Sequence, residues 1–382
     1  MARDLQARLR RIRAASLPQA PEGGKKRLFL PCPAAELPAG FPSEWTPAAR
    51  WTLRREIEFD FPRPLPQPLP PALGILVPDM GRRLPELEEL LFFDLETTGL
   101  SGGAGTVAFL AAFGRFVSAP APAPARLRIE QYLLLDYPGE YEFLQTLLPH
   151  LSSGSPVAVT YNGKTFDAPL LTTRCRMTGI EPPGFAHADL LHPARRLWKR
   201  LLPSCSQAVI ETAILGLDRD GDLPGAMAPE MWFSFLRTGE CQGLLEVCGH
   251  NARDILGLAH LFALMAFIAL DPVKAAETVR YDIEALALRW RRVTRRPGRL
   301  RGEAEDAAGR ALMEAAFARG YPRPGYALCR ALAVDAEWRQ GDIASALAYT
   351  RTAISLEGLP LAVQQDLSRR LERLIRRPGR EQ

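Results

Sequence analysis

The sequence has few cysteines, and none of them lies in a C-x-x-C pair. Zinc ribbons and small disulfide frameworks need closely spaced pairs, so this scatter argues against both classes of fold. We expect reduced thiols, most of them buried. The 382 residues include six cysteines: Cys32, Cys175, Cys205, Cys241, Cys248 and Cys329.

The sequence also lacks a long uninterrupted apolar run. The longest stretch, residues 255–270, contains His260 and is shorter than the roughly 20 residues that span a bilayer. Residues 1–17 are rich in arginine but have no apolar core and no small-residue cleavage site, which argues against a secretory signal. We therefore expect a cytoplasmic protein with no membrane partner.

Proline is distributed unevenly and divides the chain into three parts. Residues 1–88 are rich in proline, and we predict an N-terminal arm of limited packing that begins with a short amphipathic helix. Residues 89–270 have the sequence pattern of an α/β domain. Residues 271–382 are predicted to be helical. Within them the helix pair 327–340 and 343–356 is similar to one tetratricopeptide unit, but one unit does not make an array, so we favour a plain helical extension.

The central part alternates predicted strands and helices. Its predicted strands are 90–93, 107–117, 126–135 and 156–160. The predicted helices among them are 141–151 and 167–177. Residues 244–270 predict a largely buried helix that is broken or capped near Gly249. The order βββαβα followed by helices predicts an α/β fold, with a mixed sheet flanked by helices.

Four acids in this part stand where elements end or begin. Asp94 and Glu96 lie at the end of the first strand, and residues two apart on a strand face the same side. Asp167 starts a helix directly after a strand, and Asp254 lies one helical turn after His250. Acids gathered at one point need a cation, and oxygen ligands suit Mg²⁺ or Mn²⁺ better than zinc.

The order Asp-x-Glu, Asp and His…Asp on this framework resembles the DEDD (DnaQ-like, histidine subclass) 3′-to-5′ exonucleases of the ribonuclease H-like superfamily. The resemblance covers residues 90–268. Its most specific segments are FDLETTGL at 93–100, YNGKTFDAP at 161–169 and HNARD at 250–254. The segments SGGAGT at 101–106 and DLLHPARRLW at 189–198 are similar to the YprB-like branch.

The resemblance implies a two-metal phosphodiesterase. In such a site Asp94, Glu96 and Asp254 hold one Mg²⁺ or Mn²⁺ ion, Asp94 and Asp167 hold the other, and His250 is the general base. His250 precedes Asp254 by four residues, which is the spacing of the tyrosine subclass, whereas the histidine subclass usually has five. We expect an irregular backbone just before His250 to absorb this difference. The alternative for His250 is a helix-start cap or a core histidine.

The net charge of +5 is mild, but the positive charges gather in short runs. One run surrounds Trp198 and another, at 289–301, surrounds Trp290. Phosphates pair with such charges and exposed rings stack on bases, so both runs are predicted to contact single-stranded nucleic acid. An ordinary solvated face is the alternative for each. The residues predicted to contact nucleic acid are Thr97, Thr98, Gly99, Asn162, Lys164, Arg195, Arg196 and Lys199.

Two other groups of polar residues have less specific interpretations. His187, Asp189 and His192 lie close together in the sequence, and we interpret Asp189 as a helix cap rather than a metal ligand. Glu211 is either an ordinary surface acid or a support for the site from behind the metal ligands. The glycine-rich loop 101–106 lacks the pattern of a phosphate-binding loop, and we expect it to flank the active site.

Together these patterns predict a metal-dependent 3′-to-5′ exonuclease that acts on single-stranded DNA or RNA. One alternative is a catalytically silent nucleic-acid or protein-binding module on the same fold. The other is a structure-selective endonuclease. The C-terminal helices are the surface predicted for a protein partner. The presence of all four acids favours an enzyme over the silent module.

Overall fold

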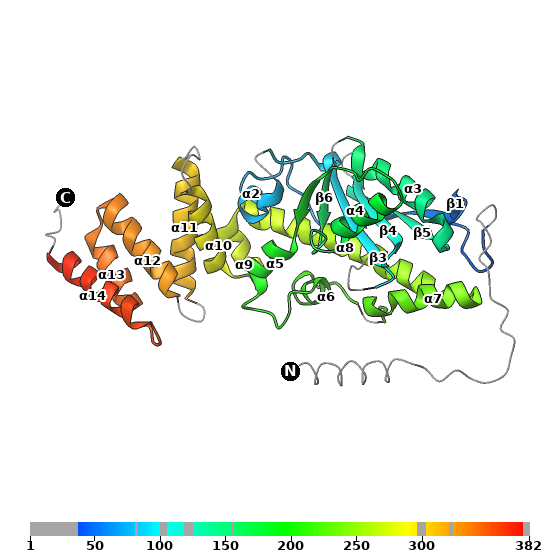
Figure 1. Ribbon diagram of the computed structural model, residues 1–382. Helices are drawn as coiled ribbons and strands as arrows, with labels where there is room; N and C mark the ends of the chain where they lie inside the picture. Colours follow the sequence, from blue (N-terminus) through cyan, green and yellow to red (C-terminus); the bar gives the residue numbers. More distant parts are fainter. Residues whose placement is uncertain are drawn as a thin grey trace, which may run out of the picture.

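The computed structural model describes residues 37–80, 83–99, 105–117, 125–154, 156–219, 221–295, 303–320 and 324–376. The amphipathic helix predicted near the N-terminus and most of the predicted glycine-rich loop lie outside these residues. Within them, a sheet covered by helices occupies one part of the molecule, and the last helices extend from it to one side (Figure 1).

Within the described residues, seven strands form one mixed sheet in the order β1-β2-β5-β4-β3-β6-β7. Strand β3 pairs antiparallel with β4 and parallel with β6, so the sheet changes from antiparallel to parallel at β3. The prediction of a mixed sheet flanked by helices is confirmed. The strands are β1 (Thr46–Ala49), β2 (Thr52–Phe61), β3 (Leu90–Thr97), β4 (Ala108–Val117), β5 (Ala125–Leu134), β6 (Val157–Thr160) and β7 (Ala186–Asp189).

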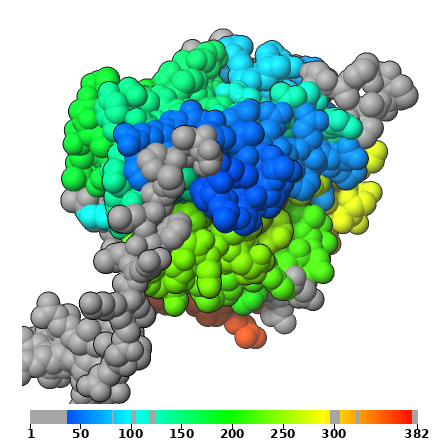
Figure 2. All heavy atoms as spheres, turned by 90° about the vertical axis from the view of Figure 1, so that its right-hand side faces the viewer, coloured from blue at the N-terminus to red at the C-terminus, as the bar shows by residue number. Residues whose placement is uncertain are grey.

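The hairpin β1-β2 contradicts the prediction that the N-terminal arm packs loosely. All ten residues of β2 pair antiparallel with β5, and Trp45, Leu53 and Phe61 are buried. In Figure 2 these N-terminal residues, in blue, spread over one end of the molecule above the yellow-green residues of its lower side. The prolines misled the prediction because they follow β2 rather than interrupt it.

Helices cover both faces of the sheet. Neighbouring residues of β3 point to opposite faces, so their contacts show which helix covers each face. Phe92 packs edge-to-face on Phe262 of helix α8 (Gln242–Leu270), with ring centroids 5.9 Å apart. Phe93 stacks on Phe113 at 5.2 Å, and Phe113 stacks on His150 of helix α3 at 4.4 Å. Helix α8 therefore lies on one face and α3 on the other.

The helices that accompany the sheet include the predicted α3 and α4, whose ends differ from the prediction by at most one residue. They are α2 (Leu73–Leu76), α3 (Glu140–Ser152), α4 (Asp167–Met177), α5 (Leu191–Trp198), α6 (Gln207–Ile210), α7 (Ala228–Thr238) and α8 (Gln242–Leu270). The C-terminal helices are α9 (Pro272–Thr278), α10 (Ile283–Thr294), α11 (Glu303–Arg319), α12 (Tyr326–Asp335), α13 (Ile343–Ile354) and α14 (Leu361–Arg376).

Helix α8 is one continuous helix of 29 residues, so the predicted break near Gly249 is wrong. His250 lies inside the helix, which also contradicts the alternative that it caps a helix start. The helix is long and apolar enough to cross a membrane, but 72% of its most apolar window is buried inside the fold. Such burial is typical of a core helix with apolar residues around most of its circumference.

The C-terminal helices continue the packing of the sheet region. Leu286 of α10, Leu312 of α11 and Leu328 of α12 belong to the same buried cluster as Phe262 of α8. The predicted helix pair is present as α12, extended by a π-helical turn at residues 336–340, and α13. Between them Gly341 has a φ of +69°, a conformation that glycine adopts without steric cost.

Gly114 of β4 lies where the sheet packs closely against α8, so a substitution there tests this packing. A β-carbon at this position would lie 2.5 Å from Cγ2 of Ile255 and 3.2 Å from Cβ of Phe92. Both neighbours are fully buried, so we expect Gly114→Ala to lower the free energy of unfolding by about 1–3 kcal/mol. Urea denaturation measures this loss against Gly184→Ala, where nothing lies within 4 Å of the added atom. Equal stability of the two variants would contradict this packing.

Candidate active site

Strand β3 brings Asp94 and Glu96 to one face of the sheet. Leu90 and Phe92 precede them on that face and are fully buried in the cluster that includes α8. The two acids continue this row at the carboxyl end of the strand. Since β3 is parallel to β6, the turn from β6 to α4 leaves the sheet at the same edge.

Asp167, the first residue of α4, lies against the two acids of the strand. Its charge raises the pKa values of both Asp94 and Glu96, so its carboxylate lies within electrostatic range of theirs. The approach is close, because a β-carbon at Gly163 would lie 2.9 Å from Oδ2 of Asp167. The turn therefore needs glycine at this position.

Asp189, at the end of β7, holds the turn that precedes Asp167. Its buried carboxylate accepts hydrogen bonds from the backbone N–H groups of Asn162 at 2.8 Å and Lys164 at 3.1 Å. It also accepts from the N–H of Leu191 at 3.0 Å, at the start of α5. Asn162 has a φ of 68°, which allows the chain to bend here. The N-cap of α5 is Leu190 rather than the predicted Asp189. Asp189 stands one residue before it, where it joins the start of α5 to the turn before Asp167.

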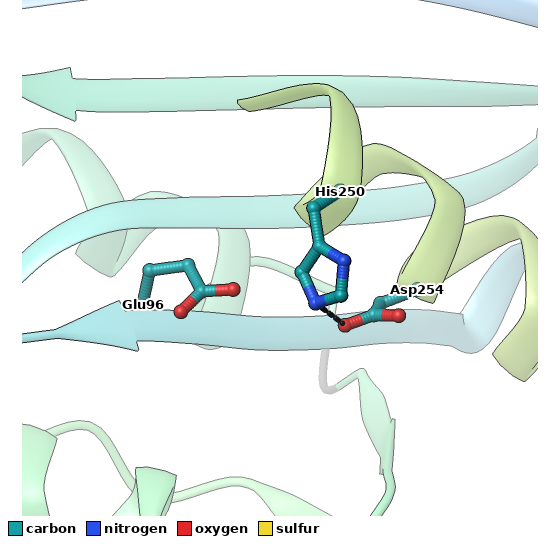
Figure 3. Close-up of side chains that lie close together, drawn as sticks. All are labelled: Glu96, His250 and Asp254. Atoms are coloured by element: carbon teal, nitrogen blue, oxygen red, sulfur yellow. Dashed lines mark ion pairs between the residues drawn. The ribbon is translucent and has the colours of Figure 1, made fainter. Parts of the chain in front are cut away.

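Helix α8 places His250 and Asp254 over the strand acids. The two residues are one turn apart on the same face, with Nε2 of His250 3.3 Å from Oδ2 of Asp254. One ligand atom from each of Glu96, His250 and Asp254 lies within 4.8 Å of the other two, and Figure 3 shows the Glu96 carboxylate directed toward this pair. The four-residue spacing therefore brings the two side chains together on a regular helix.

Burial and mutual repulsion raise the pKa values of three of these acids. Burial raises the pKa of Asp94 most, and the charges of Asp167, Asp254 and Glu96 raise it further. Burial, with the charges of Asp254 and Asp167, raises the pKa of Glu96 to about 8. Burial also raises the pKa of Asp167 to about 7. At neutral pH, full ionisation of this cluster requires a compensating cation.

The donor set fits divalent cations that prefer oxygen ligands. Glu96, His250 and Asp254 are close enough to share one ion. Asp94 and Asp167 lie outside that group of three, but they are within electrostatic range of it. Four carboxylates and one imidazole suit Mg²⁺ or Mn²⁺ better than zinc. A cation would also remove the repulsion that raises the carboxylate pKa values.

A buried chain of hydrogen bonds supports Asp94. Nδ2 of Asn251 donates to Oδ2 of Asp94 at 2.7 Å, and Nε2 of Gln131 donates to Oδ1 of Asn251 at 2.7 Å. Nε of Arg55 donates to Oε1 of Gln131 at 2.6 Å. Sequence reasoning missed this chain because its members are 76, 120 and 157 residues apart. The N-terminal hairpin therefore contributes, through Arg55, to the position of Asp94.

A second polar group, also missed from the sequence, lies on the other side of His250 and Asp254. Arg219 contacts the carboxylates of both Glu211 and Asp254. Asp222 accepts a hydrogen bond from Nδ1 of His250 at 2.9 Å and pairs with Arg219 at 3.0 Å. The side chain of Glu211 is only 1% exposed. Glu211 is therefore not an ordinary surface acid. The structure supports the other interpretation, in which Glu211 supports the site from behind the metal ligands.

The two threonines predicted to contact nucleic acid hold the end of β3 in place. Oγ1 of Thr97 donates to the carbonyl oxygen of Gly99 at 2.9 Å. Oγ1 of Thr98 accepts from the backbone N–H of Val107 at 2.9 Å. Both hydroxyls therefore shape the chain beside Glu96. Contacts of Thr97, Thr98 and Gly99 with nucleic acid stay a prediction.

The basic residues predicted to contact nucleic acid lie in two settings. Lys164 forms an ion pair with Asp79 at 2.9 Å, so its charge is already compensated. Helix α5 carries Arg195 and Arg196, and Lys199 follows its last residue, but that residue, Trp198, is fully buried. Trp290 in the second run is buried as well. The prediction that exposed rings of these runs stack on bases is therefore wrong.

Residues 91–266 match the family model of the RNase_H superfamily. This range contains the mixed sheet from β3 to β7 and all five residues of the predicted catalytic set. These residues form a ribonuclease H-like domain. Such a domain indicates nuclease or other nucleic-acid-related activity and generally works with divalent metals.

A comparison with curated proteins gives a relative of the same region. The chain is 39% identical over 180 residues to "Uncharacterized protein YprB" of Bacillus subtilis (strain 168), covering 46% of this chain and 42% of that protein. The match therefore spans less than half the length of the relative. The predicted likeness to YprB is confirmed, while the DEDD subclass and the exonuclease activity stay predictions.

The raised pKa of Glu96 predicts how the stability of a Glu96 variant, relative to the wild type, changes with pH. The carboxyl group of Glu96 has a pKa of about 8 in the folded chain, against an ordinary value of 4.5. The folded protein therefore binds this proton more tightly than the unfolded chain, and ionisation of Glu96 lowers stability as pH rises from about 5 to about 8. We expect Glu96→Gln to gain stability relative to the wild type over this window.

Thermal unfolding in EDTA, at several pH values, measures this difference. A comparison between variants is needed because burial lowers the pKa of His150, His187 and His260, which gives the opposite slope. Glu246→Gln, on the exposed surface of α8, is the matched control and should follow the wild type. A stability difference for Glu96→Gln that does not change with pH would contradict the electrostatic account of the cluster.

Proposed function

We propose that the protein is a metal-dependent 3′-to-5′ exonuclease that hydrolyses single-stranded nucleic acid. The observation that carries this proposal is the convergence of Asp94, Glu96, Asp167 and Asp254 at one edge of the sheet, beside His250. The ribonuclease H-like domain supports nuclease chemistry in general. The order of the acids along the chain, which resembles the DEDD pattern, supports the exonuclease direction.

The acids are suited to hold two cations. Asp94, Glu96 and Asp254 would hold one Mg²⁺ or Mn²⁺ ion, and Asp94 and Asp167 the other. When bound, these ions acidify the attacking water and neutralise the charge that develops on the phosphate. Asn251 keeps the Asp94 carboxylate in one orientation through its hydrogen bond at 2.7 Å.

His250 is suited to accept the proton of the attacking water. A carboxylate can only accept hydrogen bonds, so Asp222 requires the proton of His250 to be on Nδ1. Nε2 then carries the free lone pair, and it is the nitrogen that faces Asp254. This lone pair can accept the proton that the attacking water gives up, which is the role of a general base.

A catalytically silent binding module is the second candidate, and one contact favours it. Arg219 lies against the carboxylate of Asp254, and it thereby supplies part of the positive charge that a cation would bring. If Arg219 stays there, the site holds cations weakly and the fold serves only to bind nucleic acid. The response to metal separates this candidate from the exonuclease.

Incubation of the protein with Mn²⁺ and 5′-labelled single-stranded DNA or RNA tests the proposal. We expect a ladder of progressively shorter labelled products, and their absence with Asp94→Asn, because Asp94 is assigned to both cations. Asp60→Asn is the matched control, since Asp60 lies on the N-terminal hairpin with its side chain 77% exposed. This control should degrade the strand at the wild-type rate.

Other substrates decide between the candidates. Cleavage of a circular single strand would contradict the exonuclease and support a structure-selective endonuclease. Intact strands and duplexes in every reaction with Mn²⁺ or Mg²⁺ would contradict hydrolysis and support the silent module.

A further inference from the structure

Helix α5 begins at the edge of the sheet that carries the acids. The carboxylate of Asp189 accepts from Asn162 and Lys164 of the turn before Asp167, and also from Leu191 in the first turn of α5. One buried side chain therefore joins the turn before Asp167 to this helix. In Figure 1, α5 lies between the sheet and α10. A strand that leaves the acids in this direction meets α5 first.

Two exposed cations at the C-terminal end of α5, Arg195 and Lys199, lie within electrostatic range of Cys205. Arg195 and Lys199 are four residues apart. Burial raises the pKa of the Cys205 thiol, and the charges of both residues oppose this rise. Arg195 also acts on Tyr161, whose hydroxyl donates to the carbonyl oxygen of Cys205 at 2.5 Å. Both cations are thus close to the residues that border Asn162, where their charges can reach a phosphate.

Arg196, between these two cations, faces α10. Its Nη1 donates to the carbonyl oxygen of Leu76 at 3.2 Å, and Nε of Arg289 in α10 donates to that of Ile75 at 3.4 Å. The last carbonyl groups of α2 thus hold one arginine from each helix. After burial, the charges of Arg289 and Arg292 are the causes that lower the pKa of Arg196. The two basic runs of the sequence therefore meet at one place on the surface.

These charges gather without acids to balance them. In the described part of the chain, Arg195, Arg196, Lys199 and Arg292 form no ion pair. Arg200, directly after Lys199, differs because it pairs with Asp282 at 2.8 Å. Cations held together in this way repel one another and attract an anion. Because Trp198 and Trp290 are buried, the surface offers charge rather than rings.

We propose that Arg195 and Arg196 of α5, Lys199 directly after it, and Arg292 of α10 form one track for the phosphate backbone of single-stranded nucleic acid. The track leads from the acids onto the first helices of the C-terminal region. It reads phosphates and not bases, so its contribution to binding is independent of sequence. This inference rests on the proposed function, because the bound strand is the one whose end enters the active site.

The salt dependence of binding tests the track without requiring cleavage. Fluorescence anisotropy gives the Kd of an Asp94→Asn protein for a strand of about 20 nucleotides over a series of salt concentrations in EDTA. For single strands, log K falls with log salt by about 0.7 for each phosphate contact. Arg196→Gln/Arg292→Gln in this background should therefore reduce the slope by about 1.4.

A matched double variant controls for the loss of charge alone. Arg176→Gln/Arg237→Gln removes two exposed arginines at the C-terminal ends of α4 and α7, and it should leave the slope unchanged. If Arg196→Gln disturbs folding, Lys199→Gln, at an exposed position, should still reduce the slope by about 0.7. Equal slopes for the two double variants, or an unchanged slope for Lys199→Gln, would overturn the proposal.

Two further ligands test what the track recognises. A strand of the same length without bases should show the same reduction in slope for the Arg196→Gln/Arg292→Gln variant. Polyglutamate of equal charge should compete poorly, and equal competition would overturn the proposal in favour of an acidic protein partner. A reduced slope in a protein that cleaves nothing contradicts only the exonuclease, whereas an unchanged slope in an active nuclease contradicts only the track.

Discussion

Four carboxylates at one desolvated edge of a sheet repel one another, and much of the surrounding structure holds them together against that repulsion. Three of the four acids are restrained by different partners. Asp94 accepts from Asn251, the turn before Asp167 is held by Asp189, and Asp254 contacts Arg219 and His250. None of these contacts neutralises the whole cluster, as the raised pKa values of Asp94, Glu96 and Asp167 indicate. A bound cation would relieve this repulsion, so the repulsion between the acids favours cation binding.

Parts of the fold that are distant from the acids along the chain help to hold the acids in position. The N-terminal hairpin reaches Asp94 through Arg55, Gln131 and Asn251, so an element at the edge of the sheet helps to orient a residue at its centre. Most of helix α8 is buried against one face of the sheet, and its polar groups lie beside the acids at the end of β3. Asp189 connects the turn before Asp167 with α5. The polar groups of the site are therefore fixed by the same contacts that build the domain.

The parts of the fold that were predictable from the sequence have strong local patterns. Strand β3 is an apolar run that ends in an acid, and α4 begins at the residue predicted, Asp167. The hairpin β1-β2 was missed because the nearby prolines dominated the composition, and β7 has only four residues. Helix α8 was predicted to break at Gly249, but burial against the sheet outweighs the low helix propensity of one glycine.

The candidate site divides in the same way. The four acids and His250 were found because each lies in a short motif, and the structure brings them to one edge of the sheet. Asn251, Gln131, Arg219 and Asp222 were not found, because their roles depend on partners distant in the sequence or on a loop without a recognisable pattern. Burial of Trp198 also depends on the tertiary fold, since its neighbours in the sequence are basic.

Titration with Mn²⁺, followed by electron paramagnetic resonance, tests the central claim that these acids form a cation site. Asp94 is assigned to both cations, so the account predicts two bound ions per chain in the wild type and in Asp60→Asn. It predicts the loss of tight binding of both ions in Asp94→Asn. The same Mn²⁺ binding in Asp94→Asn as in the wild type, or no tight binding in any of these proteins, would contradict it.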